Sequence, residues 1–140
     1  MINNPLDDEH FLKKEIDCIV LDDEADLCFM MQAILKSKGF SVKYLTDAAL
    51  LDNLLLNYHP KVLILDLQLG EFDGSVICKK IIEDKNIPPL KVLLISASFD
   101  GLQKATVCGA DSFLEKPFGI KEFEEKVTSL MPIGEKSLTA

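Results

Sequence analysis

Residues 62–74 read VLILDLQLGEFDG, and the interpretation of the whole chain starts from them. Four consecutive aliphatic residues without polar alternation predict a β-strand that is buried on both faces. The strand closes with Asp66, and a turn from Gly70 to Gly74 follows. Because a buried carboxylate is costly without partners, Asp66 requires a cation, hydrogen-bond donors or an opening to water.

The size and charge of the chain exclude several classes of protein. At 140 residues it has the length of one domain. It carries 23 acidic and 15 basic residues, a formal net charge of −8 and a sequence pI of about 4.7, which argues against direct nucleic-acid binding. We find neither an apolar run long enough to span a membrane nor a signal peptide, so we expect a cytoplasmic protein without a membrane partner.

The four cysteines do not form a recognisable metal or disulfide pattern. They lie inside apolar segments, and no two of them form a C-x-x-C pair: Cys18, Cys28, Cys78 and Cys108. Such spacings are unusual for zinc ligands, and disulfides are rare in the cytosol. We therefore predict reduced cysteines in the core.

Strands and helices are predicted to alternate five times along the chain. Apolar β-branched runs predict strands at 16–21, 40–45, 61–65, 90–95 and 110–115. Helical spacing of apolar residues predicts helices at 26–38, 47–57, 75–84 and 120–131, and 99–108 is predicted as a weak helix because it has fewer large apolar residues. Within 75–84 we expect Val76, Ile77 and Ile81 to be buried. Apolar strands joined through helices predict a parallel sheet that is covered on both faces.

The simplest topology is an α/β, flavodoxin-like (βα)5 three-layer sandwich. Its doubly wound five-stranded parallel sheet has the order 2-1-3-4-5, and ligands bind such sheets beyond the carboxyl ends of strands one and three. We assign the domain to residues 16–131. Residues 1–15 are a lead-in, either frayed or a short docking helix, and residues 132–140 are a tail or linker without a pattern.

The ends of strands one and three carry Asp22, Asp23 and Asp66. Three carboxylates at one opening repel one another, and a divalent cation resolves this conflict. Oxygen ligands without nearby His or Cys suit a hard ion such as Mg²⁺, for which the backbone carbonyl of Gln68 is a further ligand. An acid pair before a helix is often only a cap, but the coincidence of strand ends favours a metal site.

The remaining strand ends supply a hydroxyl and a cation. Ser96 can donate a hydrogen bond to a phosphoryl oxygen, and Lys116 can neutralise its charge. Asp66 is then a nucleophile that attacks phosphorus in line. Taken singly, each residue has a structural explanation as a turn former or a solvated charge. Their joint placement on one side of a sheet favours phosphoryl chemistry.

As a set, these motifs resemble the receiver domain of two-component response regulators. The resemblance covers roughly residues 16–131. It rests on four segments: Val20-Leu21-Asp22-Asp23-Glu24, Leu65-Asp66 through Asp73-Gly74, Ile95-Ser96-Ala97, and Glu115-Lys116-Pro117-Phe118. The final Lys-Pro-Phe is weak by itself, whereas the four segments together are highly specific.

The resemblance implies a role for each of these side chains. Asp66 is implied to be the phospho-acceptor, and Asp22 and Asp23 the acid pair that holds Mg²⁺, with Asp23 as the direct ligand. Ser96 matches the switch Ser/Thr of the family, and Lys116 matches its invariant lysine. The donor is implied to be a histidine kinase or a histidine phosphotransfer protein. The chain is then a signalling switch that catalyses only its own phosphoryl transfer and dephosphorylation, and not an enzyme.

Other positions carry the switch or depart from the family. Phe113 falls on the aromatic switch position, where core packing is an equal explanation. The loop after the acceptor has Leu69-Gly70 where Met-Pro is usual, and Gln68 and Ser98 stand where the family tunes the lifetime of the acyl phosphate. Movement of Ser96 and Phe113 is implied to change the surface of the fourth helix, fifth strand and fifth helix, and with it partner binding or homodimerisation.

Two alternatives remain open. The first is a degenerate receiver that never takes phosphate and serves as a binding module, which the altered loop allows. The second is an Asp-based phosphatase of the haloacid dehalogenase type, which needs a second acid two residues after its nucleophile, where this chain has Gln68. We find no output segment, so the chain is either a single-domain regulator or the receiver of a longer protein.

Overall fold

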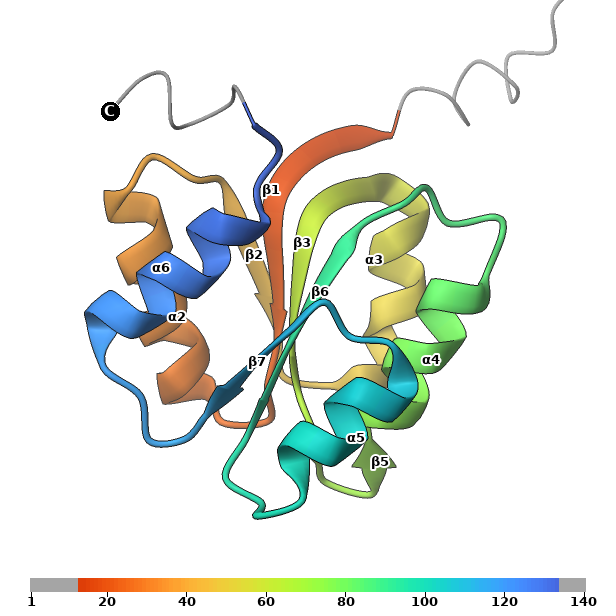
Figure 1. Cartoon of the computed structure of the whole chain (residues 1–140). Helices are drawn as coiled ribbons and strands as arrows, with labels where there is room; N and C mark the ends of the chain where they lie inside the picture. Colours follow the sequence, from red (N-terminus) through yellow and green to blue (C-terminus); the bar gives the residue numbers. More distant parts are fainter. Residues whose placement is uncertain (1–12, 134–140) are drawn as a thin grey trace, which may run out of the picture.

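The computed structural model describes residues 13–133, and a five-stranded parallel sheet forms its centre (Figure 1). The strands are β1 (Lys14–Leu21), β2 (Val42–Leu45), β3 (Tyr58–Asp66), β6 (Lys91–Ser96) and β7 (Ser112–Glu115). The helices are α2 (Ala25–Ser37), α3 (Leu51–Asn57), α4 (Gly74–Glu83), α5 (Gly101–Cys108) and α6 (Ile120–Leu130). The strand order β2-β1-β3-β6-β7 confirms the predicted order 2-1-3-4-5.

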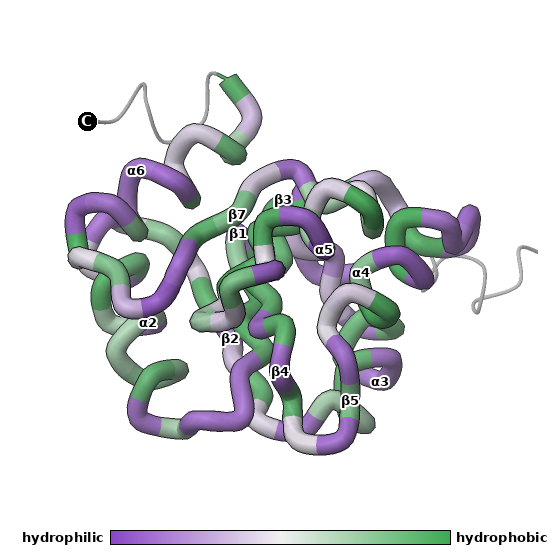
Figure 2. The backbone as a smooth tube through the Cα atoms, turned by 60° about the horizontal axis from the view of Figure 1, so that its bottom comes forward, coloured by the Kyte–Doolittle hydropathy of each residue, from purple (hydrophilic) through white to green (hydrophobic). Residues whose placement is uncertain are grey.

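The sheet is covered on both faces, as the apolar strands predicted. Helices α2 and α6 lie on one face, and α3, α4 and α5 lie on the other (Figure 1). Successive residues of β3 alternate between the two cores: Val62 and Ile64 pack on the α2–α6 side, and Leu63 and Leu65 on the other. This alternation explains why the strand has no polar face. Figure 2 shows hydrophobic residues concentrated in the sheet and a mixture of hydrophobic and hydrophilic residues along the helices.

Several strand boundaries differ from the predicted ones because of hydrogen bonds to neighbouring elements. Strand β3 begins at Tyr58, three residues before predicted, because its first residues pair with the start of β1, where Lys14 is opposite Tyr58. The last two residues of the predicted lead-in 1–15 therefore belong to the sheet. Strands β2 and β7 begin late because the N–H groups of Phe40 and Ala110 still donate to carbonyls of the preceding helices. Residues 1–12 and 134–140 lie outside the described residues.

The segments around α3 and α4 also depart from prediction. The predicted helix 47–57 consists of a 3₁₀ turn, η1 (Ala48–Leu50), followed by α3. The turn Gly70–Gly74 contains part of a small hairpin of β4 (Gln68–Leu69) and β5 (Phe72–Asp73). The predicted burial of Val76 is wrong, since its exposed fraction is 64%. Helix α4 buries Cys78 and Ile81, and a residue two positions before Cys78 points away from that face.

Other predictions concern the cysteines and the membrane. All four cysteines lie in the described part of the chain and are buried free thiols, so their core location is confirmed.

Within residues 13–133, none of the helices has the length and apolar character needed to cross a membrane.

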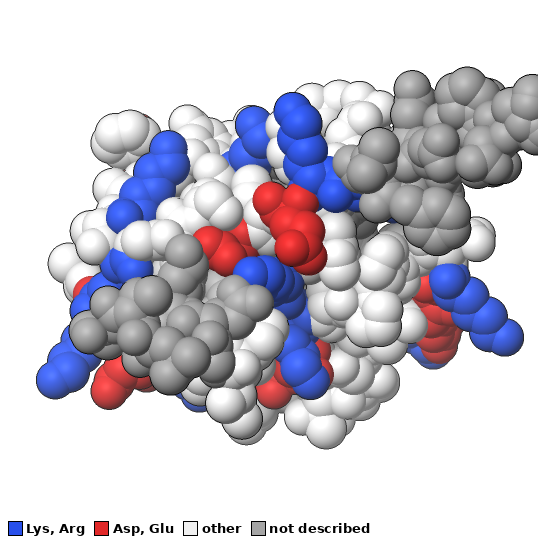
Figure 3. All heavy atoms as spheres, turned by 90° about the horizontal axis from the view of Figure 1, so that it is seen from above, with Lys and Arg blue, Asp and Glu red and all other residues white. Residues whose placement is uncertain are grey.

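The predicted functional side chains all lie at one end of the sheet. At the end where the strands begin, acidic and basic side chains are interspersed (Figure 3). At the opposite end, Asp22 follows β1 and Asp66 closes β3. Ser96 closes β6, and Lys116 follows β7. The fold therefore brings the four predicted strand-end positions to one edge.

Candidate functional site

Three aspartates meet at the carboxyl end of the sheet. Because β1 and β3 are neighbours and Leu21 is opposite Leu65, the residues that follow, Asp22 and Asp66, emerge side by side. Both are buried, with exposed fractions of 1% and 6%, whereas Asp23 is exposed. One carboxylate oxygen from each of the three residues lies within 4.8 Å of the other two. The structure therefore brings the predicted acids into one cluster.

Lys116 reaches the same cluster from the loop after β7. Its Nζ donates to Asp66 Oδ2 at 2.9 Å and to Asp22 Oδ2 at 3.1 Å, and it lies 3.7 Å from Glu24 Oε1. Strand β7 is two strands away from β3, with Ser96 opposite Glu115 in the intervening pair. The parallel register of β6 and β7 thus delivers the ammonium to two carboxylates that are far away in the sequence.

Burial and mutual repulsion disfavour the charged carboxylates of the cluster, and Lys116 offsets them only in part. Burial raises the pKa of Asp22 to about 6, and the charge of Asp66 raises it too, against the hydrogen bonds from the Glu24 N–H and from Lys116. Burial lowers the pKa of Lys116, but its hydrogen bonds to Asp66 and Asp22 raise it more, so that its net shift is upward. One lysine is therefore firmly charged but does not offset three acids.

The switch candidates lie beside each other next to this cluster. Ser96 is 1% exposed, and its hydroxyl oxygen accepts a hydrogen bond from the Ser98 N–H at 2.8 Å. The ring of Phe113 is half-buried and packs against Gly101, the first residue of α5. A Cβ at Gly101 would lie 2.9 Å from that ring and 3.0 Å from Ser96 Cβ. Both Ser96 and Phe113 therefore pack against Gly101, and a side chain at position 101 would clash with them.

The start of α4 is packed directly against the backbone of Asp66. We interpreted Gly74 as a turn former, but a Cβ there would lie 2.1 Å from the Asp66 carbonyl oxygen, and the Gly74 N–H donates to Leu67 O at 2.7 Å. Asp73 caps the helix by accepting from the Ser75 N–H at 2.9 Å. Any side chain at position 74 would push α4 away from Asp66.

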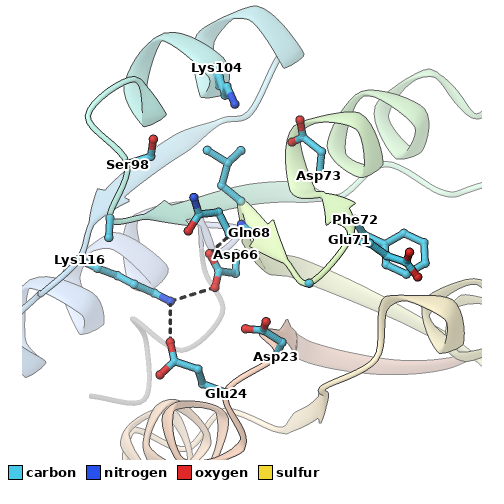
Figure 4. A pocket seen from close by; sticks show the side chains of 13 residues that line it. Asp23, Glu24, Asp66, Gln68, Glu71, Phe72, Asp73, Ser98, Lys104 and Lys116 are labelled. Atoms are coloured by element: carbon cyan, nitrogen blue, oxygen red, sulfur yellow. Dashed lines mark hydrogen bonds and ion pairs between the residues drawn. The ribbon is translucent and has the colours of Figure 1, made fainter.

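A pocket of about 700 Å³ opens over the cluster (Figure 4). Gln68 lies at its mouth, where its N–H donates to Asp66 Oδ1 at 3.1 Å. Sequence reasoning gave no site role to four charged residues of the wall, namely Glu24, Glu71, Asp73 and Lys104. The Asp-Gly-Ser run could have indicated Asp73 as a helix cap, whereas the inward direction of Lys104 has no signal in the sequence.

These groups can bind a hard dication and a phosphate-like anion together. The donor atoms of the three aspartates are all oxygens, which Mg²⁺ prefers. Lys116 lies within hydrogen-bond distance of the buried Asp66 and therefore can contact a group attached to that carboxylate. The pocket gives such a group access from solvent.

Comparisons with known proteins agree with this geometry. The model of the response regulator receiver domain family matches residues 18–128. The chain is 29% identical over 115 residues to the probable transcriptional regulator ycf27 of Guillardia theta, covering 81% of this chain and 44% of that protein. It thus spans about half the length of the curated relatives it matches.

Solved structures show the same fold. A response regulator receiver domain from Bermanella marisrubri superposes with a TM-score of 0.73 at 25% identity, covering 84% of this chain and 98% of that one. A CheY-like receiver domain protein from Methanospirillum hungatei superposes with a TM-score of 0.73 at 19% identity, covering 91% and 99%. At such low identity, the second similarity concerns the fold alone.

Proposed function

The chain belongs to the response regulator receiver domain family, and from that premise we propose that it accepts a phosphoryl group on Asp66. The donor is a phosphohistidine on a histidine kinase or a histidine phosphotransfer protein. The observation that supports this best is the position of Asp66: a buried carboxylate below an open pocket, 2.9 Å from Lys116 and beside two further acids.

The proposed cofactor is Mg²⁺, held by Asp22, Asp23, Asp66 and the backbone carbonyl of Gln68. The donor set consists of oxygens alone, and Asp22 lies beside Asp23 and Asp66, whose negative charges a dication would offset. When bound, Mg²⁺ supplies positive charge close to the oxygens of the transferring phosphoryl group.

In the proposed transfer, an oxygen of Asp66 forms a bond to phosphorus while the N–P bond of the donor breaks and the imidazole keeps its electron pair. Lys116 and Ser96 donate hydrogen bonds to the phosphoryl oxygens and stabilise the charge that Asp66 acquires. The same residues later permit hydrolysis by water. The chain thus acts as a signalling switch whose chemistry is limited to its own phosphorylation and dephosphorylation.

The proposed output is a change in the surface formed by α5, β7 and α6. If Ser96 turns to the phosphoryl group, it gives up the hydrogen bond from the Ser98 N–H, and the Phe113 ring beside it gains space. Leu102 and Val107 on α5 are 62% and 76% exposed, which suits a surface that binds a partner or a second copy. Phosphorylation then biases two pre-existing states.

Phosphorylation by a small donor tests the proposal. Acetyl phosphate with Mg²⁺ is expected to add one base-labile phosphoryl group, detected by intact mass, and Asp66→Asn is expected to lose it. Labelling that persists in Asp66→Asn would assign another acceptor. A folded wild-type protein that takes no label would instead support the degenerate receiver, and sustained hydrolysis of many equivalents would support the phosphatase.

A further inference from the structure

A second lysine lies on the wall of the pocket and has no part in the proposed transfer. Lys104, on α5, lines the same pocket as Asp66 and Lys116. In Figure 4 its amine points into the pocket from above Asp66, while Lys116 approaches from the left. The two cations therefore come from different elements and face the acceptor from different sides.

Lys104 is held only loosely in its present position. Its Nζ lies 3.8 Å from Asp100 Oδ2, and the two side chains are 44% and 34% exposed. Exposed ion pairs one helical turn apart contribute little stability, so exchanging this partner has a low cost. The charge of Lys104 also affects Asp73 on the opposite wall of the pocket. Burial raises the pKa of Asp73, but the hydrogen bonds from Ser75 and the positive charge of Lys104 lower it more, so that the net shift is downward.

Phosphorylation would create a need for this charge. A phosphoryl group on Asp66 replaces one negative charge by nearly two at neutral pH. A dication and Lys116 together offset the three carboxylates of the cluster, but not this additional charge. Lys104 is the next lysine on the pocket wall, so it is the nearest available source of the missing positive charge among the residues that line it.

We propose that Lys104 leaves Asp100 and binds the phosphoryl group on Asp66 as a second cation, an inference that rests on the proposed function. Asp100 accepts a hydrogen bond from the Ser98 hydroxyl at 2.5 Å, and the Ser98 N–H donates to Ser96 Oγ. Ser96 and Lys104 therefore contact opposite ends of the loop between β6 and α5, at Ser98 and Asp100. Their joint movement toward the phosphoryl group shifts the first turn of α5.

The test measures the binding of beryllofluoride, a phosphoryl mimic, to the full chain in the presence of Mg²⁺, by titration of backbone amide resonances. Loss of one charge-assisted hydrogen bond is expected to weaken binding about tenfold in Lys104→Gln. Lys104→Arg is expected to restore the affinity to within about twofold. The matched control is Lys79→Gln, which removes an exposed lysine of α4 that does not line this pocket.

A second readout separates a lost cation from a damaged site. Mg²⁺ affinity without beryllofluoride is expected to be unchanged or slightly tighter in Lys104→Gln, because removing a positive charge cannot weaken cation binding electrostatically. Weaker Mg²⁺ binding in this variant, or beryllofluoride binding equal to that of the wild type, would overturn the role of Lys104 alone. A wild-type protein that binds Mg²⁺ but not beryllofluoride would overturn the proposed function of Asp66 as well.

Discussion

Two buried aspartates, one in strand β1 and one directly after it, have surroundings that are opposite in character. Asp17, in the first half of the strand, accepts hydrogen bonds from the Ser41 N–H at 2.8 Å and the Ser41 hydroxyl at 3.2 Å, and it lies 3.4 Å from Lys61 Nζ. Asp22, directly after the strand, shares one lysine with Asp66 and lies beside Asp23. Both carboxylates are more than nine-tenths buried.

The difference separates a buried carboxylate that the fold compensates from one that it compensates only in part. Asp17 lies beside the opposite charge of Lys61 and accepts hydrogen bonds from Ser41, so it joins β1 to the residue before β2 and to β3. Burial and, to a smaller extent, the charge of Asp66 raise the pKa of Asp22, which makes the folded state less stable near neutral pH. Functional sites often carry such unfavourable contacts, and the rest of the fold offsets them.

The largest expected effect is a difference in phosphorylation rate between variants of Lys116 and Lys61. Lys116→Gln is expected to slow phosphorylation by acetyl phosphate about 100-fold or more, because it removes the cation closest to Asp66. Lys61→Gln changes the lysine beside Asp17, far from the pocket, and is expected to keep the wild-type rate. Rates are measured by intact mass at a temperature where both variants are folded. Equal rates for Lys116→Gln and wild type would contradict the role of Lys116.

The next effect concerns Asp17 alone. Asp17→Asn removes the negative charge of a buried carboxylate that pairs with Lys61, and this lysine is only 20% exposed. We expect a loss of about 3 kcal/mol in the free energy of unfolding, measured by urea denaturation at pH 7. Phosphorylation of the folded variant is expected to be normal. A loss below about 1 kcal/mol would show that the pair is no more than a surface contact.

Asp22 is expected to make the stability of the protein depend on pH. Its folded pKa of about 6 exceeds its ordinary value of 3.8, so the folded state holds the proton more tightly, and stability falls as the pH rises from 4 to 6 and is then level. Relative to Asp22→Asn, the wild type is expected to lose about 2 kcal/mol across this range. Urea denaturation of both proteins at pH 4 and pH 7 measures the difference. Parallel pH profiles would contradict it.

The smallest effect is the stabilisation by Mg²⁺. At ten times its Kd, Mg²⁺ is expected to add about 1.4 kcal/mol to the free energy of unfolding. Thermal melts should show this shift in the wild type and in Asp17→Asn. It is expected to be absent when Asp22 and Asp23 are both replaced by Asn. A shift that survives the double replacement would remove the acid pair from the metal site.

Much of the fold could be predicted because local patterns decide it. The run Val62–Leu65 is apolar at every position, which only a strand packed on both faces explains, and helical spacing located the five helices. The predictions failed where tertiary contacts outweigh the pattern. Val76 fits an apolar pattern but points away from the buried face of α4, and Tyr58 joins the sheet because β1 lies beside it.

The candidate site was predictable in its residue types but not in its geometry. Strand ends indicated Asp22, Asp66, Ser96 and Lys116, since the carboxyl ends of parallel strands meet at one edge. Nothing in the sequence showed that Lys104 points into the pocket. The direction of a helix face is set by the packing of the whole helix, not by the residue itself.

The sequence by itself determined a parallel α/β sandwich and the group of acids, hydroxyl and lysine at its edge, because periodicity and strand ends are local properties of the chain. Only the tertiary structure decided which charges meet. Asp17 lies in β1 and Asp22 directly after it, only five positions later, yet the first faces Lys61 and Ser41 and the second faces Asp66 and Lys116. Pairing between strands sets those neighbours, and interactions between charges depend on distance in space rather than separation in sequence.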